Sequence, residues 1–140
     1  MISEPTISRA VHQLLAELEF GNPKAVFAGI GIDVETNRTV DSRAARFFLS
    51  EPEQRLLASD SGPASAKLLL RIWTVKEAIF KADPDNSGRI LADYLLQDPA
   101  AASGAAYRKD CAELQFYYNS FEVQNGFVAV AIAGRRKPHA

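Results

Sequence analysis

Two short stretches of the chain carry residues whose types and spacing could do chemistry. In the first, Asp33 and Glu35 lie two residues apart, and in the second, Trp73, Glu77 and Lys81 recur every four residues. A strand places residues i and i+2 on one face, where two carboxylates repel each other unless a cation joins them. A helix stacks residues i, i+4 and i+8, so one helix face would carry an aromatic ring, a carboxylate and an ammonium group.

Each stretch also has an ordinary structural explanation. Glu77 and Lys81 stand in the favourable order for an i, i+4 ion pair, and most such ladders only stabilise a surface helix. Asp33 and Glu35 could be solvated acids on an edge strand. For the strand alone, a metal site and solvated acids are about equally well supported.

The elements that must position these residues can be predicted from periodicity. Residues 25–35 alternate with a period of two, which predicts a strand. Gly29 and Gly31 precede Asp33 on the same face and leave it bare, so a bulky group can approach the backbone there. Residues 64–82 have helical spacing, and their apolar side should face a core. That side consists of Leu68, Ile72, Val75 and Ile79, while Lys76 and Phe80 flank the chemical stripe.

The rest of the chain predicts an α+β fold, in which the long helix packs on a small antiparallel sheet. A helix is predicted over about 4–20, and the core over about 25–134, in a single domain of residues 1–140. Asp41 or Ser42 could cap a short helix, and Ser50 with Glu53 has the form of a capping box. Strands are predicted at about 113–123 and 127–133, joined at Asn125-Gly126. A surface loop is predicted at 98–104 and a disordered basic tail from Arg135 onward.

Composition excludes several classes of function. A chain of 140 residues with 47% hydrophobic and 24% charged residues is typical of one soluble domain. Its net charge of −1 argues against a general nucleic-acid binder. Cys111 is the single cysteine, so no internal disulfide can form and a reducing compartment is expected. No segment has the length of a membrane span or the pattern of a signal peptide, which favours a cytoplasmic location.

Taken together, the two stretches resemble the paired signature of the 4′-phosphopantetheinyl transferase superfamily. That signature runs Gly-x-Asp and then, after a gap of similar size, Trp-x-x-Lys-Glu-Ala-x-x-Lys, matching Gly31–Glu35 and Trp73–Lys81 here. Residues 50–53, following Phe47-Phe48, also resemble the family's Phe-x-x-x-Glu stretch. The likeness covers roughly residues 25–134.

The resemblance implies an activity and roles for individual residues. Members of the family transfer the phosphopantetheine arm of coenzyme A to a serine of an acyl or peptidyl carrier protein, with Mg²⁺, and release 3′,5′-adenosine bisphosphate. By resemblance, the magnesium ligands come from both motifs, and the coenzyme A-binding residues are Trp73, Lys76 and Lys81 of the second motif together with Arg38. The implied magnesium ligands are Asp33, Glu35 and Glu77. Glu77, directly or through water, is also the implied general base, and Lys76 and Lys81 are implied to lie near the coenzyme A phosphates. For Trp73, support of the site and an ordinary role as a core anchor are about equally well supported.

The size of the chain departs from part of the family. The motifs resemble those of the larger transferases, which contain two similar halves, whereas this chain has the length of one half. The small acyl-carrier-protein synthases of the family form homotrimers with sites between neighbours, so a homo-oligomer, with a trimer favoured, is expected here. Arg38, Arg43 and Arg46 are the residues expected to reach a neighbour's phosphates.

Two other functions compete with this interpretation. A non-catalytic half-transferase could keep the fold and only bind a carrier protein or a partner subunit. A magnesium-dependent nuclease is the third, but the slightly negative charge and the lack of a basic run with interleaved aromatic residues argue against it.

Overall fold

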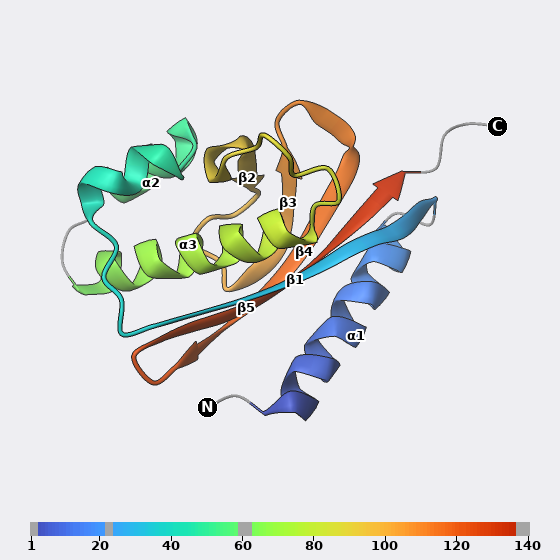
Figure 1. Cartoon of the computed structure of the whole chain (residues 1–140), viewed down its shortest axis with the longest axis horizontal. Helices are drawn as coiled ribbons and strands as arrows, with labels where there is room; N and C mark the ends of the chain where they lie inside the picture. Colours follow the sequence, from blue (N-terminus) through green and yellow to red (C-terminus); the bar gives the residue numbers. More distant parts are fainter. Residues whose placement is uncertain (1–2, 22–23, 59–62, 137–140) are drawn as a thin grey trace.

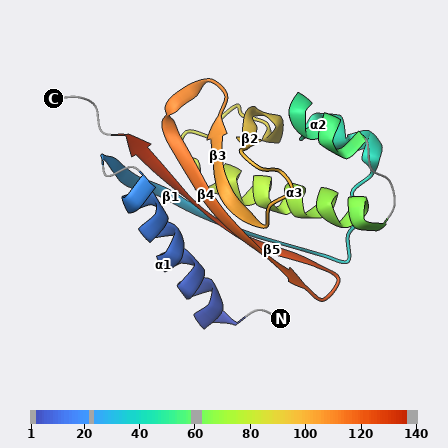
Figure 2. The same ribbon diagram turned by 180° about the vertical axis from the view of Figure 1, so that it is seen from behind.

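The computed structural model describes residues 3–21, 24–58 and 63–136, and these residues form an α+β fold (Figures 1 and 2). Two helices lie on opposite faces of one antiparallel sheet, so the predicted class, with a long helix on an antiparallel sheet, is confirmed. In chain order the elements are α1 (Glu4–Gly21), β1 (Ala25–Thr36), η1 (Ser42–Phe47), α2 (Glu51–Ala58), α3 (Pro63–Ala82), η2 (Leu91–Asp93), β2 (Tyr94–Leu96), β3 (Ser103–Arg108), β4 (Cys111–Val123) and β5 (Gly126–Arg136).

The sheet has five strands in the order β1-β5-β4-β3-β2, and each neighbouring pair is antiparallel. Strand β1 therefore lies at an edge. It pairs with β5 over its whole length, from Ala25 opposite Arg136 to Thr36 opposite Gly126. Among the described residues, the strand that carries Asp33 is therefore hydrogen-bonded to another strand along one edge only.

Helix α3 packs against small residues of the sheet. On the α3 face, β1 presents glycines, and β5 presents buried alanines at positions 129, 131 and 133. A Cβ atom added at Gly29 would lie 2.1 Å from the carbonyl oxygen of Ala82, and one added at Gly31 would lie 2.1 Å from that of Ala78. Only glycine therefore lets the helix backbone approach the strand this closely. The bulky group predicted to approach this bare face is α3 itself.

Helix α1 covers the opposite face of the sheet. Its Leu14 and Leu18 are buried against Val130 and Ile132 of β5, which alternate with the alanines beneath α3. The large residues of β5 thus pack against α1, and its small residues pack against α3. No helix in the described ranges has the length and apolar character that a membrane span requires.

The predicted helix caps are confirmed in the segment between β1 and α3. The side chain of Asp41 accepts a hydrogen bond from the backbone N–H of Arg43 at 2.8 Å and caps η1. Before α2, the backbone N–H of Ser50 donates to Glu53 Oε1 at 2.8 Å, and the N–H of Glu53 donates back to Ser50 Oγ at 3.4 Å. This reciprocal pair is the predicted capping box.

The C-terminal part of the chain differs from the prediction in three places. Residues 103–108 were expected to begin in a loop but form strand β3, because they pair with β4. The hairpin loop is Gln124 and Asn125, one residue earlier than predicted, and Asn125 supplies the positive φ of 62°. Arg135 does not begin a disordered tail; it lies in β5 and pairs with Asp85 at 2.6 Å. Residues 137–140 lie outside the described part of the chain.

Candidate active site

The structure brings three carboxylates together where the C-terminal half of α3 crosses β1. We call Asp33, Glu35 and Glu77 the acidic cluster. Lys81 Nζ donates to Asp33 Oδ1 at 2.9 Å and to the carbonyl oxygen of Ile32 at 3.2 Å. The other carboxylate oxygen, Asp33 Oδ2, is buried and has no hydrogen-bond partner among the described residues. Asp33 therefore offers one free acceptor inside the site.

Glu35 is held by an aromatic ring and a cation. Its Oε1 accepts a hydrogen bond from Trp73 Nε1 at 3.3 Å, and its Oε2 lies 3.5 Å from Arg38 Nη1. The Arg38 guanidinium also stacks over the Trp73 ring, 4.7 Å from its centroid. Sequence spacing alone placed Trp73 on the same helix face as Glu77. In the structure, its indole N–H contacts the carboxylate of Glu35 on the neighbouring strand.

The other two carboxylates of the acidic cluster both act on the pKa of Glu77. Burial raises the pKa of Glu77, the Asp33 carboxylate raises it further, and Glu35 acts in the same direction; Lys81 and Arg38 oppose this shift. The hydrogen bond to Asp33 raises the pKa of the Lys81 ammonium. Ionised together, the acids repel each other, and bound cations relieve that repulsion.

The donor set fits a hard divalent cation, although it does not form a complete cage. Carboxylate oxygens are the ligands that Mg²⁺ prefers, and the free Asp33 Oδ2 is available as one. In the described ranges no three His, Cys, Asp or Glu side chains converge closely enough to hold a metal ion as they stand. Magnesium usually takes only one or two carboxylates together with substrate phosphates. An acidic cluster that is incomplete without substrate is compatible with that mode of binding.

Lys76 does not lie in this cluster, contrary to the expectation that it stands near the phosphates. It is fully buried, and its Nζ donates to the carbonyl oxygen of Phe48 at 2.8 Å and to Glu53 Oε1 at 2.5 Å. Burial lowers the pKa of its ammonium, and Glu53 opposes that shift. One residue on a helix is a rotation of about 100°, which turns Lys76 inward although its neighbour Glu77 faces the cluster.

The other predicted cations divide between the site and the surface. Arg38 contacts the acidic cluster through Glu35. Arg43 is exposed and pairs with Asp41 at 3.0 Å, and the Arg46 guanidinium lies over the exposed Phe47 ring at 5.0 Å. Neither of these two contacts indicates a role in the cluster of the same chain.

A groove adjoins the cluster on the side of Glu77. It encloses about 350 Å³, and its wall is mostly aromatic and aliphatic. We call it the aromatic groove. It is lined by Phe47, Phe48, Trp73, Glu77, Phe80, Arg89, Ile90 and Leu91. Sequence reasoning did not identify the contribution of residues 89–91, because their position depends on the turn after α3.

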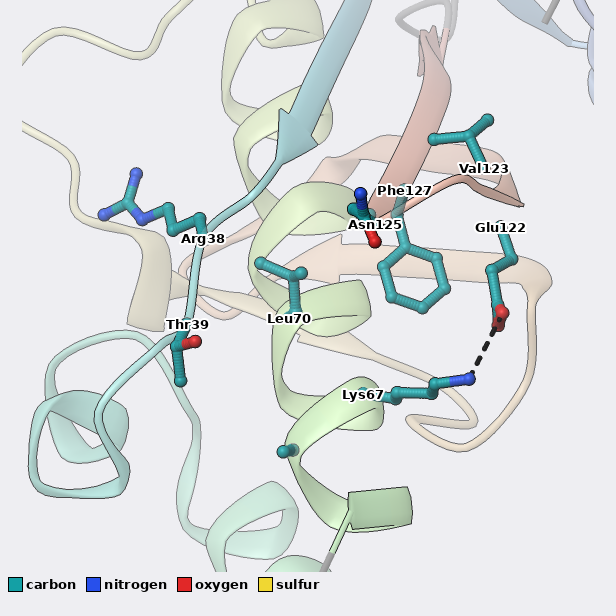
Figure 3. Close-up of a pocket in the computed structure, with 10 residues that line it drawn as sticks. Arg38, Thr39, Lys67, Leu70, Glu122, Val123, Asn125 and Phe127 are labelled. Atoms are coloured by element: carbon teal, nitrogen blue, oxygen red, sulfur yellow. Dashed lines mark hydrogen bonds and ion pairs between the residues drawn. The ribbon is translucent and has the colours of Figure 1, made fainter. Parts of the chain in front are cut away.

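A second hollow, of about 300 Å³, is lined in part by Arg38 (Figure 3). Leu70 and Phe127 form its apolar part, and Lys67 pairs with Glu122 across its rim at 3.4 Å. Figure 3 shows Arg38 directed away from this ion pair. Arg38 lines this hollow and also pairs with Glu35 of the acidic cluster, so it links the two.

Comparisons with known proteins agree with the motifs and the fold. A family model described as the 4′-phosphopantetheinyl transferase superfamily matches residues 29–132, which include the whole acidic cluster and exclude α1. The fold is similar to that of holo-[acyl-carrier-protein] synthase from Thermotoga maritima, with 18% identity and a TM-score of 0.53. That match covers 80% of this chain and 66% of the other, just under two thirds of its length. A search of curated proteins finds no match.

Proposed function

Because this chain belongs to the 4′-phosphopantetheinyl transferase superfamily, we propose that it transfers the phosphopantetheine arm of coenzyme A to a serine of an acyl or peptidyl carrier protein. The observation that carries the proposal is that Asp33 and Glu35 of β1 lie near enough to Glu77 of α3 to raise the pKa of its carboxyl, with Lys81 and Arg38 beside them. This arrangement suits phosphoryl transfer, which relies on positioning and on stabilising charge.

Asp33, Glu35 and Glu77 are the residues that would hold Mg²⁺. When bound, the ion would act as a Lewis acid on the pyrophosphate oxygens of coenzyme A. The hydrogen bond to Asp33 raises the pKa of the Lys81 ammonium, so this group stays protonated. Its side chain is half exposed and can approach a phosphate oxygen. Arg38 can do the same from the other side of the cluster.

Glu77 is the proposed general base. The carrier serine hydroxyl loses its proton to Glu77, directly or through a water molecule, as its oxygen attacks the phosphorus that bears the pantetheine arm. The bond from that phosphorus to the bridging oxygen breaks, and 3′,5′-adenosine bisphosphate leaves. A carboxylate is a stronger base when its pKa is raised toward the working pH, and burial with Asp33 raises the pKa of Glu77 in this way.

The aromatic groove provides a place for the pantetheine arm. The arm is uncharged and carries aliphatic segments on either side of its two amides, and the groove has aromatic and aliphatic side chains along its wall with Glu77 among its lining residues. A ligand lying in the groove would bring its phosphate end to the cluster. Buried apolar contact would also give binding energy that does not depend on the metal.

A second copy of the chain would complete the site. The acidic cluster has only Lys81 and Arg38 as direct cationic neighbours in the contacts described above, whereas coenzyme A carries three phosphate groups. On the opposite face of β1, Ile30, Ile32 and Val34 are exposed, with 39–56% of their surface accessible, which supports a neighbour at this edge. A homo-oligomer, with a trimer favoured, is therefore part of the proposal, and light scattering at micromolar concentration tests it.

Incubation of the protein with coenzyme A, Mg²⁺ and an apo carrier protein tests the activity. Intact mass spectrometry should show the carrier gaining one phosphopantetheine group, and Glu77→Gln should prevent this while Glu122→Gln, a surface control, should not. A carrier that stays unmodified would refute the proposed transferase. Binding of the carrier without modification would instead support a non-catalytic binding module.

Magnesium binding can be tested without turnover. Trp73 is the only tryptophan, and its indole N–H donates to Glu35 Oε1. Titration with MgCl₂ should therefore change Trp73 fluorescence in the original protein and not in Asp33→Ala. An unchanged signal in the original protein, together with metal-independent transfer, would remove Mg²⁺ from the proposal.

A further inference from the structure

A buried polar cluster lies behind the wall of the aromatic groove. Lys76 and Glu53 are 0% and 1% exposed, and they form an ion pair between α3 and α2. Glu53 uses both oxygens, because Oε1 also accepts from the backbone N–H of Ser50 at 2.8 Å and Oε2 accepts from that of Leu96 at 3.0 Å. One carboxylate thus ties α2, α3 and β2 together.

The same ammonium fixes the main chain at Phe48. Lys76 Nζ donates to the carbonyl oxygen of Phe48, the residue that follows and caps η1, at 2.8 Å. The Phe48 ring is itself buried and meets the Trp73 ring edge to face, with centroids 5.0 Å apart and planes at 89°. Aromatic pairs of this kind have a preferred orientation, so the place of one ring restricts the other.

Trp73 completes a continuous path of contacts to the acidic cluster. Its indole N–H donates to Glu35 Oε1 at 3.3 Å. The path runs from the Glu53–Lys76 pair to the Phe48 main chain, from the Phe48 ring to Trp73, and from Trp73 to a carboxylate of the cluster. Each step is a direct contact between described atoms.

We propose that the Glu53–Lys76 pair is a positioning device that sets the orientation of Trp73 and, through it, of the Glu35 carboxylate. Lys76 then acts on the reaction through other residues and does not bind a phosphate of coenzyme A. This inference rests on the proposed function for its kinetic consequence, whereas the orientation of Trp73 can be measured without any activity.

The free-energy cost of burying the Glu53 and Lys76 charges indicates that this pair does more than stabilise the fold. Burying two charges is expensive, and replacing such a pair with well-packed apolar residues is often neutral or stabilising. A pair kept solely for stability would therefore be a poor choice. An ammonium that holds a backbone carbonyl oxygen fixes a direction, which an apolar contact in the same place does not do.

Lys76→Met is the test, with Lys67→Met as its matched control. Methionine keeps the length of the lysine stem and removes its charge, and Lys67 is an exposed lysine on the same helix. In folded Lys76→Met, checked by circular dichroism, we expect a shifted Trp73 emission and greater quenching by acrylamide. We also expect kcat to fall about 100-fold, as for a displacement of about 1 Å in an active site, with little change in the KM for coenzyme A. Lys67→Met should match the original protein in Trp73 emission, acrylamide quenching, kcat and the KM for coenzyme A.

Two results would overturn the positioning role. One is an unchanged Trp73 signal, and the other is a loss expressed in the KM for coenzyme A, as expected for a lost phosphate contact. If the single variant does not fold, the double variant Lys76→Met with Glu53→Leu leaves no unpaired buried charge and replaces it. It should show the same shifted emission and low kcat. A shifted emission in Lys76→Met, when the original protein itself transfers nothing, would refute the proposed function and leave the positioning inference standing.

Discussion

Gly31→Ala tests whether the close approach of α3 to β1 assembles the acidic cluster. The added Cβ would lie 2.1 Å from the carbonyl oxygen of Ala78, 2.7 Å from the nitrogen of Ala82 and 2.8 Å from the Cβ of Lys81. Real Cβ contacts are essentially never shorter than 3.0 Å, so the helix must withdraw by about 0.9 Å at Ala78. Two of the three obstructing atoms belong to the backbone, so a change of rotamer does not relieve the clash.

The expected magnitude follows from that displacement. Overpacking of a core typically costs about 1–3 kcal/mol of unfolding free energy. Helix withdrawal also separates Glu77 and Lys81 from Asp33, whose distance to Lys81 is now 2.9 Å. A misplacement of about 1 Å can reduce a rate about 100-fold, so kcat/KM for carrier modification should fall by about that factor.

Urea unfolding and the mass-spectrometric transfer assay measure the two effects of Gly31→Ala separately. Gly104→Ala is the matched control, because the nearest atom to a Cβ added there is the Tyr118 hydroxyl at 3.4 Å, an ordinary contact that requires no backbone movement. The control should retain its unfolding midpoint and its activity. A Gly31→Ala protein with the original midpoint and the original kcat/KM would refute the view that glycine at this position permits the site.

The remaining predictions concern single side chains. Asp33→Ala should abolish transfer with little change in unfolding free energy, since it removes a carboxylate from a repelling group; unchanged turnover across a magnesium titration would contradict this. Burial raises the pKa of Tyr118 to about 12, so the folded state holds this proton more tightly than the unfolded state. Stability from this group is present below about pH 10 and is lost by about pH 12, by about 2–3 kcal/mol, and Tyr118→Phe should reduce that alkaline loss in urea unfolding. Arg108→Met leaves the fully buried Asp83 without its charge partner at 2.9 Å and should cost about 3–5 kcal/mol, whereas exposed Lys109→Met should cost under about 1 kcal/mol; equal midpoints would contradict this.

Local patterns predicted much of the fold because they act over a few residues. The helix of residues 63–82, the strand of residues 25–36 and the caps at Asp41 and Ser50 each depend on neighbours within one or two turns, and the structure confirms them. Strand β3 could not be predicted in this way. Its residues, Ser103–Arg108, show no apolar alternation, and pairing with β4 is what makes them a strand.

Gly126 belongs to a correctly predicted hairpin, but the structure requires glycine there for a different reason. The pair Asn125-Gly126 predicted a hairpin, and the hairpin exists, with Asn125 supplying the positive φ. A Cβ added at Gly126 would instead lie 1.8 Å from the carbonyl oxygen of Glu35 in the neighbouring strand. The need for glycine comes from a residue some ninety positions earlier in the chain, which no short-range pattern contains.

In the candidate site, too, some features follow from local sequence spacing and others only from tertiary packing. Sequence spacing by itself determined that Asp33 and Glu35 share one face of a strand and that Glu77 and Lys81 share one face of a helix, since strand and helix periodicities are local properties. Only the tertiary structure decided that these two faces meet, because the meeting depends on glycine and alanine residues of β1 and β5 that let α3 lie close. Tertiary packing also decided that Lys76 faces Glu53 in the interior, because α2 and β2 supply the acceptors and hydrogen bonds that a buried charge requires.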